Sequence, residues 1–383
     1  MINFSVIICT YNGASRIPRV LERLQQQTAI AALAWEVIVV DNNSSDQTAE
    51  VFRQCQANWR LNSRLRYCFE SRQGLAYARR CGVHNAQGSV LAFLDDDNLP
   101  HTTWLAELAA FSNRHPRAGA YGGPVYGEFE VPPPKGFERI ARFFALVQGD
   151  VPYCYNEKYS KAGIKMFPPG AGIIIRKEAW QSSIKRSPTL PQTGEDLEML
   201  LQIWQAGWEI WFVPSIKIDH HIPASRFEQT YLTQFFHKNG LVRYPYRMLQ
   251  YRAWQKPLLT VLYILNDLKK LTVFTLINQG QETDLIYQCE QRFLLSTLLS
   301  PAYHLWDIIK KMTFFRKLPK LIGFTLRVMV TDKLKSNGAA KRQLLEDVEH
   351  GQHKGANNRV ANSRRPTQVK KRRMERFKFP GGC

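Results

Sequence analysis

The sequence contains few cysteines, and none of them forms a closely spaced pair. The seven are scattered over 383 residues, at positions 9, 55, 68, 81, 154, 289 and 383. An odd number of cysteines without a Cys-x-x-Cys motif argues against both a disulfide framework and a structural zinc site. We therefore expect the protein to occupy a reducing compartment.

Long apolar runs are missing as well. The most apolar stretches of the second half are residues 257–265 and 271–277, which Asn266, Asp267, Lys269 and Lys270 separate. Neither stretch reaches the ~20 residues that a membrane-spanning helix needs. The first apolar run, residues 4–9, follows no basic leader and stops at a polar Thr-Tyr-Asn, so it is interpreted as a strand and not a signal peptide.

Acidic residues are in the minority. The chain has 52 Lys and Arg against 32 Asp and Glu, a net charge of +20. Part of the excess lies between Arg364 and Lys378, where eight basic residues and one acid give a local +7. Such a balance indicates anionic partners, namely phosphates, nucleic acid or an acidic membrane surface.

The first 240 residues alternate short apolar runs with helical patterns. Strands are expected at residues 4–9, 35–40, 65–69 and 90–94, and Ile17, Val20, Leu21 and Leu24 have helical spacing between the first two. Strands alternating with helices in this way predict βαβ units and a mainly parallel sheet, an α/β fold. Polar residues follow three of these strands at one edge of the sheet, where ligands bind in such folds.

Three successive carboxylates, Asp95, Asp96 and Asp97, end the strand at 90–94. They repel one another unless a cation lies among them, and a divalent metal holding a phosphorylated ligand meets that need. Carboxylate oxygens suit Mg²⁺ or Mn²⁺. The alternative is a solvated acidic turn before the next helix.

Later segments carry weaker signals. Residues 127–170 are rich in proline and aromatic residues, which favours a lid or binding loop. Thr193-Gly-Glu195-Asp196 opens a helical pattern and resembles a capping box. From residue 227 the chain is helical and amphipathic, and between residues 303 and 330 aromatic residues alternate with Lys and Arg. That mixture is typical of a helix in a membrane interface, although helices packed on the first domain would also explain it. Beyond residue 335 we expect disorder.

Several of these segments together resemble the family 2 glycosyltransferases. They are Ser5–Asn12, Glu36–Asp46, Gly74–Arg80, the strand ending in Asp95–Asp97, Gly194–Asp196 and His221–Arg226. The resemblance covers residues 3 to 240 and implies the GT-A fold, a Rossmann-like domain with a mixed, mainly parallel sheet. One departure is Arg80, where many relatives have Asn, which puts the diphosphate contacts in doubt. Within the family, the proline-rich insert and helical tail look most like bacterial enzymes of extracellular-polysaccharide assembly.

The expected domain organisation follows from this resemblance. Residues 1–240 form the glycosyltransferase domain, with a nucleotide-sugar-binding half at 1–125 and an acceptor half at 126–240 that contains the insert 127–170. Residues 241–334 form an amphipathic helical region associated with the membrane. Residues 335–383 form a disordered basic tail.

The reaction implied is inverting transfer of a sugar from a nucleoside diphosphate to an acceptor hydroxyl, with Mn²⁺ or Mg²⁺ neutralising the leaving group. Asp196 is the expected base, supported by Glu195. The expected metal ligands are Asp97, Asp95 and His221, the last because a neutral imidazole can complete the shell. The expected nucleotide-sugar contacts are Thr10, Tyr11, Asn12, Asp41, Arg72, Arg79, Asp95, Asp96 and Arg226.

Structural alternatives exist for several of these residues. Asp41 could cap the helix that follows Ser45, although Asp46 already supplies such a cap. Arg72 and Arg79 could lie on a solvated helix face, and the histidines could be structural. Asp196 could serve as a helix-capping residue and as a base at once.

The resemblance also implies a setting. We expect a UDP-sugar donor, a glycan or lipid-linked acceptor, and a peripheral position on the cytoplasmic, inner face of the cell membrane, bound to its anionic surface. A nucleotidyltransferase acting on sugar phosphates is an alternative, but Tyr11–Arg16 is not the Gly-rich basic loop it requires. A basic nucleic-acid-binding protein is a further alternative. No nucleic acid is expected, because the tail lacks aromatic interleaving or an RNA-binding fold.

Overall fold

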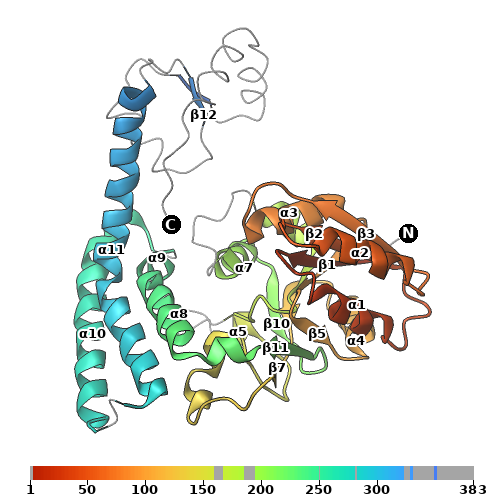
Figure 1. Cartoon of the computed structure of the whole chain (residues 1–383), viewed down its shortest axis with the longest axis horizontal. Helices are drawn as coiled ribbons and strands as arrows, with labels where there is room; N and C mark the ends of the chain where they lie inside the picture. Colours follow the sequence, from red (N-terminus) through yellow and green to blue (C-terminus); the bar gives the residue numbers. More distant parts are fainter. Residues whose placement is uncertain are drawn as a thin grey trace. The chain divides into compact units, whose positions relative to one another are not determined.

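We describe a computed structural model of the chain (Figure 1). It describes residues 3–158, 167–184, 195–249, 251–280, 283–322, 328–330 and 349–351, with side chains of the long last helix described as far as residue 310. The chain divides into two compact units, residues 1–304 and 305–383. The elements that position the site all belong to the first unit.

The core of the first unit is an eight-stranded sheet with the order β3-β2-β1-β4-β9-β6-β10-β8. Four strands were expected from the sequence and form one parallel block: β1 (Phe4–Thr10), β2 (Trp35–Asp41), β3 (Arg64–Phe69) and β4 (Val90–Asp95). The register places Thr10 beside Asp41 and Cys9 beside Asp95, so their polar ends share one edge.

The other half of the sheet is mixed. β9 (Ile174–Arg176) runs antiparallel to both β4 and β6 (Ala118–Gly122), whereas β10 (Glu209–Phe212) runs parallel to β6 and antiparallel to β8 (Tyr153–Cys154). The predicted mixed, mainly parallel α/β sheet is therefore confirmed. β6 and β8 carry little apolar alternation, and no strand was expected at either of them.

Helices cover both faces of the sheet, because successive side chains of each buried strand point to opposite sides. On one face Val6, Ile8 and Val39 pack against α1 (Ile17–Gln25) and α4 (Trp104–Arg114), with α2 (Thr48–Ala57) alongside. On the other face Ile7 and Phe93 pack against α3 (Leu75–Asn85), α6 (Lys177–Ser183) and α7 (Glu195–Gln205). Figure 1 shows α1 and α4 on the opposite side of the sheet from α3.

A second, three-stranded sheet lies next to the aspartates. Its middle strand, β11 (Ile218–Ile222), pairs antiparallel with β5 (Asn98–Pro100) and parallel with β7 (Val125–Phe129). β5 begins directly after the three aspartates, and His220 of β11 is in register with Asn98. This sheet was not predicted from the sequence.

The proline-rich segment is more ordered than a loop. It holds β7, two 3₁₀ turns (η1, Phe137–Arg139, and η2, Ala141–Phe144), β8 and α5 (Tyr155–Lys158). Phe137 and Phe144 pack with Phe236 in an aromatic cluster. Residues 159–166 lie outside the described part of the chain, and the expected role of the segment as a lid or binding loop stays a prediction.

The remainder is helical, as the sequence indicates from residue 227. The elements are η4 (Ala224–Phe227), α8 (Gln229–Leu241), α9 (Arg243–Met248), η5 (Ala253–Gln255), α10 (Lys256–Ile277) and α11 (Leu285–Ile322). Two short strands, β12 (Val328–Val330) and β13 (Glu349–Gly351), pair in parallel. Apart from β13, the tail predicted to be disordered lies outside the described residues. Within the described ranges, no helix combines the length and the apolar character needed to cross a membrane.

Candidate active site

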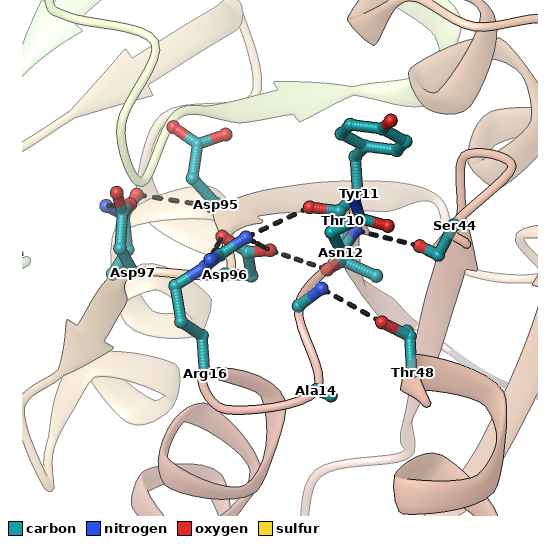
Figure 2. A network of polar contacts seen from close by, with 12 residues as sticks. Thr10, Tyr11, Asn12, Ala14, Arg16, Ser44, Thr48, Asp95, Asp96 and Asp97 are labelled. Atoms are coloured by element: carbon teal, nitrogen blue, oxygen red, sulfur yellow. Dashed lines mark hydrogen bonds and ion pairs between the residues drawn. The ribbon is translucent and has the colours of Figure 1, made fainter. Parts of the chain in front are cut away.

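The three aspartates occupy a tight turn between β4 and β5, and their carboxylates diverge (Figure 2). The buried Asn98 holds the turn, because its side-chain oxygen accepts the Asp95 amide at 3.2 Å. Asp96 faces the loop after β1, Asp97 faces β11, and Asp95 faces α3. Each acid therefore has its own surroundings although the three are consecutive in sequence.

Asp96 is engaged by a cation that the sequence did not single out. Arg16 donates from Nε to Oδ1 at 2.8 Å and from Nη2 to Oδ2 at 2.9 Å, and Thr10 Oγ1 donates to Oδ2 at 2.5 Å. Arg16 also donates to the Tyr11 carbonyl at 3.1 Å. The Asp96 carboxylate thus fastens the loop after β1 to the start of α1. Its predicted contact with the nucleotide stays a prediction.

That loop approaches the acid so closely that one position must be glycine. A Cβ added at Gly13 would lie 1.9 Å from Thr10 Oγ1 and 2.7 Å from Asp96 Oδ2. The Gly13 amide donates to Thr48 Oγ1 at 2.9 Å, which fixes the loop against α2. Contacts with Asp96 on one side and with Thr48 of α2 on the other therefore fix the conformation of this loop.

The loops after β1 and β2 are joined by reciprocal hydrogen bonds. The Asn12 amide donates to Ser44 Oγ at 2.9 Å (Figure 2). Asn12 Oδ1 accepts the Ser45 amide at 2.8 Å. Asn12 has a φ of 49°, a left-handed conformation that Asn tolerates better than most residues. The Tyr11 ring is 47 % exposed on this joined surface.

Asp41 is buried, and both of its oxygens are engaged. Oδ1 accepts the Ser44 amide at 2.9 Å, and Oδ2 accepts the Tyr67 hydroxyl at 2.6 Å. Asp46 accepts the Thr48 amide at 3.0 Å just before α2, whose N-cap position is Gln47. Asp41 therefore stabilises the turn after β2, and its predicted contact with the nucleotide stays a prediction.

Asp97 lies beside two basic side chains, His220 and Arg226. Arg226 Nη2 donates to Asp97 Oδ2 at 3.0 Å, and His220 Nε2 lies 3.4 Å from the same oxygen. Burial alone would raise the pKa of Asp97, but the His220 contact and the positive charge of Arg226 outweigh it and lower that pKa. Asp97 and Arg226, which the sequence singled out separately, are thus close in space.

The histidine beside Asp97 is His220 and not His221, which corrects the sequence-based choice. Because alternate residues of a strand face opposite sides, only one of the two can point to the turn. The His220 Nδ1 lies 2.9 Å from the Phe144 carbonyl, whereas the His221 ring lies 3.1 Å from Arg19 and 3.3 Å from both Glu128 and Glu130. His221 contacts the turn only through its amide, which donates to the Asp97 carbonyl at 2.9 Å.

Arg79 connects two of the predicted acids. It is buried on α3, forms a short hydrogen-bonded ion pair with Asp196 at the start of α7, and has Nη2 4.0 Å from Asp95 Oδ1. Its guanidinium also lies over the Phe93 ring, 5.7 Å from the centroid. Burial raises the pKa of Asp95, the other two aspartates add to that rise, and Arg79 opposes it. The alternative of a solvated helix face is therefore wrong for Arg79.

The start of α7 is packed tightly around Asp196. A Cβ at Gly170 would lie 1.9 Å from Asp196 Oδ2. The neighbouring Glu195 turns toward α3, where burial raises its pKa against the opposing effect of Arg79. Residues 193 and 194, on which the capping-box interpretation depends, lie outside the described part of the chain.

Arg72 is not brought to the aspartates. It pairs with Glu70 at 3.0 Å and stacks over Tyr77, 4.6 Å from the ring centroid. The sequence analysis missed Asn42, whose amide nitrogen donates to the Arg72 carbonyl at 2.7 Å and whose oxygen accepts the Gly74 amide at 2.7 Å. Asn42 thereby ties the end of β2 to the start of α3.

In the part of the chain that the structure describes, no three His, Cys, Asp or Glu side chains converge as a metal cage. Asp97 and His220 nevertheless place a carboxylate and an imidazole nitrogen side by side. Because Mg²⁺ is usually held by one or two protein groups with substrate phosphates and water completing the shell, this pair fits such an ion.

A mixed, mainly parallel sheet with acids at the carboxyl edge defines a GT-A-type nucleotide-binding fold. A mannosyltransferase from Pyrobaculum calidifontis, solved in complex with GDP-Man and Mn²⁺, shares this fold with a TM-score of 0.55 at 19% identity, over 80% of this chain and 87% of that one. The family model Glycosyl transferase family 2 matches residues 5–182.

Relatives give the same assignment. The glycosyltransferase AglE of Haloferax volcanii is 40% identical over 232 residues, which are 60% of this chain and 70% of the relative. The poly(ribitol-phosphate) beta-N-acetylglucosaminyltransferase TarS of Staphylococcus aureus is 30% identical over 115 residues, 30% of this chain but only 20% of TarS. This chain belongs to glycosyltransferase family 2. It is a glycosyltransferase, as the sequence predicted, and the nucleotidyltransferase alternative is set aside.

Proposed function

We propose that this glycosyltransferase binds a nucleoside-diphosphate sugar at the carboxyl edge of β1, β2 and β4 and transfers the sugar to an acceptor hydroxyl with inversion. The observation that carries the proposal is the group of Asp97, His220 and Arg226. An acid, an imidazole and a guanidinium within 3.4 Å of one another suit a metal-bound diphosphate better than a solvated turn.

The metal would be held by Asp97 and His220. A ligating histidine commonly donates its other ring N–H to a carbonyl, and the Phe144 carbonyl stands 2.9 Å from Nδ1 of His220. That contact favours the tautomer in which Nε2 is free to bind a cation. Mn²⁺ or Mg²⁺ would neutralise the negative charge that develops on the diphosphate as the glycosidic bond breaks.

Arg226 would add a second positive charge at the diphosphate. Its guanidinium pairs with Asp97 and lies 3.1 Å from His220 Nε2. A metal ion at these two groups would compete with the guanidinium for the same oxygen and nitrogen. Arg226 would then be available to the anionic leaving group.

Asp196 would take the proton from the acceptor hydroxyl as that oxygen attacks. An inverting displacement needs one carboxylate on the acceptor side. Arg79 orients Asp196 and reaches toward Asp95, so it links the acceptor and donor sides through one buried side chain. Glu195 would support this arrangement from the adjacent position on α7.

The nucleoside would lie over the joined loops after β1 and β2. Thr10, Tyr11 and Asn12 would line the pocket for base and ribose, with the exposed Tyr11 ring available for stacking. Asp95 would help to hold the ribose or the metal. The donor that we propose to test first is a UDP-sugar, and the GDP-Man complex of the Pyrobaculum mannosyltransferase makes a GDP-sugar the second.

The acceptor that we propose is a glycan or lipid-linked glycan of the cell surface. The name of TarS, which acts on poly(ribitol-phosphate), supports such a role in the family. A lipid-linked acceptor requires the enzyme to work at a membrane. We therefore place the protein peripherally on the inner face of the cell membrane, attracted by its anionic surface.

The test is calorimetric titration with UDP, GDP and dTDP, each with and without Mn²⁺. One nucleotide should bind in a metal-dependent way, and Asp97→Asn should abolish the metal dependence. Glu50→Gln is the matched control, because Glu50 is an exposed acid of α2 that pairs with Arg53 of the same helix. If none of the three nucleotides binds when metal is present, the proposal is overturned.

A further inference from the structure

Helix α10 exposes apolar side chains along one side. We call the α10 stripe six of its exposed residues, with exposed fractions from 44 % to 68 %: Leu258, Val261, Leu262, Leu265, Val273 and Leu276. Their successive separations of three, one, three, eight and three residues return to one side of a helix at ~100° per residue, and Lys269 lies on the same side between Leu265 and Val273. Apolar surface of this extent on one helix indicates an interaction site.

The opposite side of α10 fastens the helix to the first unit. Asp267 is buried there and pairs bidentately with Arg247 of α9, whose Nη2 lies 2.8 Å from Oδ1. Phe274 stacks on Tyr287 of α11 at 5.1 Å between ring centroids. Asp267 lies about half a helical turn from both Leu258 and Leu265 at ~100° per residue. The α10 stripe therefore faces away from the helices that anchor α10, and Figure 1 shows α10 beside α11.

Apart from the buried Asp267, all charged residues of α10 are positive. They are Lys256, Lys269 and Lys270. Trp254, 74 % exposed in η5, directly precedes the helix. An apolar stripe that includes an exposed lysine, with a second lysine beside it and an exposed tryptophan before it, is the pattern of a helix lying in the headgroup layer of a membrane.

Two candidates could cover the α10 stripe, a lipid bilayer and a second copy of the chain, and charge distinguishes between them. Two copies joined through the α10 stripe would bring their lysines together, and each chain carries a net charge of +20. An anionic lipid surface has the opposite sign and attracts each nearby lysine. The complementarity therefore favours lipid.

We propose that the α10 stripe, with Trp254 and the lysines Lys269 and Lys270, docks the protein onto an anionic bilayer with α10 parallel to the surface. This inference rests on the membrane location given under the proposed function and names the face responsible. Its test uses no nucleotide, metal or acceptor, so failure of docking and failure of the proposed chemistry can be told apart.

The first experiment is co-sedimentation of the full chain with phosphatidylcholine vesicles that contain or lack phosphatidylglycerol. Binding is compared at about 0.15 M and about 1 M salt, where the Debye length is ~8 Å and ~3 Å, so that attraction through the basic residues of the C-terminal tail is screened in the second case. Wild type should prefer the anionic vesicles and should keep part of its binding at high salt through the apolar stripe.

The variant Leu262→Gln/Leu265→Gln should reduce high-salt partitioning roughly tenfold or more, because two leucines no longer gain from leaving water. The matched control is Val131→Gln/Val151→Gln, which changes two exposed apolar residues outside α10 and should bind as wild type does. Equal high-salt binding by the stripe variant and wild type, with equal thermal midpoints, would overturn the proposal.

Substitutions that remove the positive charge of Lys269 and Lys270 test their part in docking. Lys269→Gln/Lys270→Gln should weaken low-salt binding to anionic vesicles more than Arg60→Gln/Lys135→Gln, which removes the same charge from exposed positions elsewhere. Equal losses would overturn the part assigned to Lys269 and Lys270.

Hydrogen exchange of wild type with vesicles should slow at the amides of α10, and protection confined to other segments would contradict the proposal. Light scattering provides the last outcome. A dimer that becomes monomeric in the leucine variant, without vesicle binding by wild type, would assign the α10 stripe to a second copy instead.

Discussion

At the scale of single residues, three adjacent aspartates have three different partners. Asp96 is taken by Arg16 and Thr10, Asp97 by His220 and Arg226, and Asp95 faces Arg79 across 4.0 Å. A run of identical acids in the sequence contains no information on these directions, because a tight turn sends successive side chains to different sides. Asp97, which lies beside the Nε2 atom of His220, is therefore the acid suited to a metal.

Asp196→Asn should lower kcat by about 10²–10⁴ while leaving the affinity for the nucleotide within about threefold. The substitution removes a proton acceptor but keeps the shape of the group beside Arg79, and general base catalysis contributes on that order. Steady-state kinetics and calorimetry on the same preparation measure the two quantities. Comparable losses in nucleotide affinity and in kcat would show that Asp196 serves the donor and not the acceptor.

Glu195 leads to a prediction on stability and pH. Burial raises its pKa in the folded protein, so the folded state binds more protons than the unfolded state between the unfolded and the folded pKa. Stability therefore falls as pH rises through that window, and the penalty is fully present above it. Glu195→Gln, which mimics the protonated form, should be more stable than wild type at pH ~7, and the difference should vanish toward pH ~4, below the unfolded value.

Thermal unfolding of both proteins across this pH range measures the difference. Glu50→Gln provides the baseline, because Glu50 is exposed. A Glu195→Gln effect that does not change with pH would mean that its cause is packing and not the titration of the carboxyl.

At the scale of elements, the sequence foretold the parallel block and missed the second sheet. Apolar runs at 4–9, 35–40 and 90–94 and the spacing on α1 are local signals, and the carboxyl-edge site follows from them. β5 has three residues and β11 has the sequence Ile-Asp-His-His-Ile, so both owe their pairing to partners far along the chain. The choice between His220 and His221 depended on that pairing, because only the register of β11 decides which ring faces Asp97.

The same limit applies to cations and to the insert. Arg16 lies 80 residues from Asp96 in sequence, and no local sequence pattern near either residue predicts their ion pair. The proline-rich segment was expected to be a lid or binding loop, and the sequence did not indicate that its phenylalanines pack against α8. Asp196 was found through the family resemblance, and its contact with Arg79 appeared only in three dimensions.

Gly13→Ala tests the loop between β1 and α1 as a unit. The added Cβ would overlap Thr10 Oγ1 and crowd Asp96, so the loop must shift at a cost of about 1–3 kcal/mol. We expect a lower thermal midpoint and nucleotide binding weakened at least about tenfold, because ~1.4 kcal/mol corresponds to that factor. Differential scanning fluorimetry and calorimetry measure the two effects.

Gly207→Ala separates the site from general stability. Gly207 has a φ of 90° and nothing lies within 4 Å of an added Cβ, so this change strains the backbone far from the aspartates. It should lower the thermal midpoint and leave nucleotide binding intact. If both variants weaken binding equally, the loop after β1 has no special part in the donor site.

At the scale of the whole molecule, positive charge gathers at several places. Cations at the aspartate turn, among them Arg16, Arg79 and Arg226, compensate local acids, whereas Lys269 and Lys270 are exposed on α10. The tail between Arg364 and Lys378 carries a local +7 in sequence. We expect the lysines of α10 and the charge of the tail to attract an anionic surface over a long range.

Replacing the eight Lys and Arg between Arg364 and Lys378 by Gln should therefore separate attraction from docking. Electrostatic attraction acts over a Debye length and is screened by salt, whereas apolar burial is not. The neutralised chain should bind anionic vesicles more weakly at low salt, with a shallower dependence on salt, and should match wild type at high salt. Its affinity for nucleotide should not change, because no residue of the proposed site lies beyond Arg226. Loss of high-salt binding in this variant would transfer the docking role from the α10 stripe to the tail.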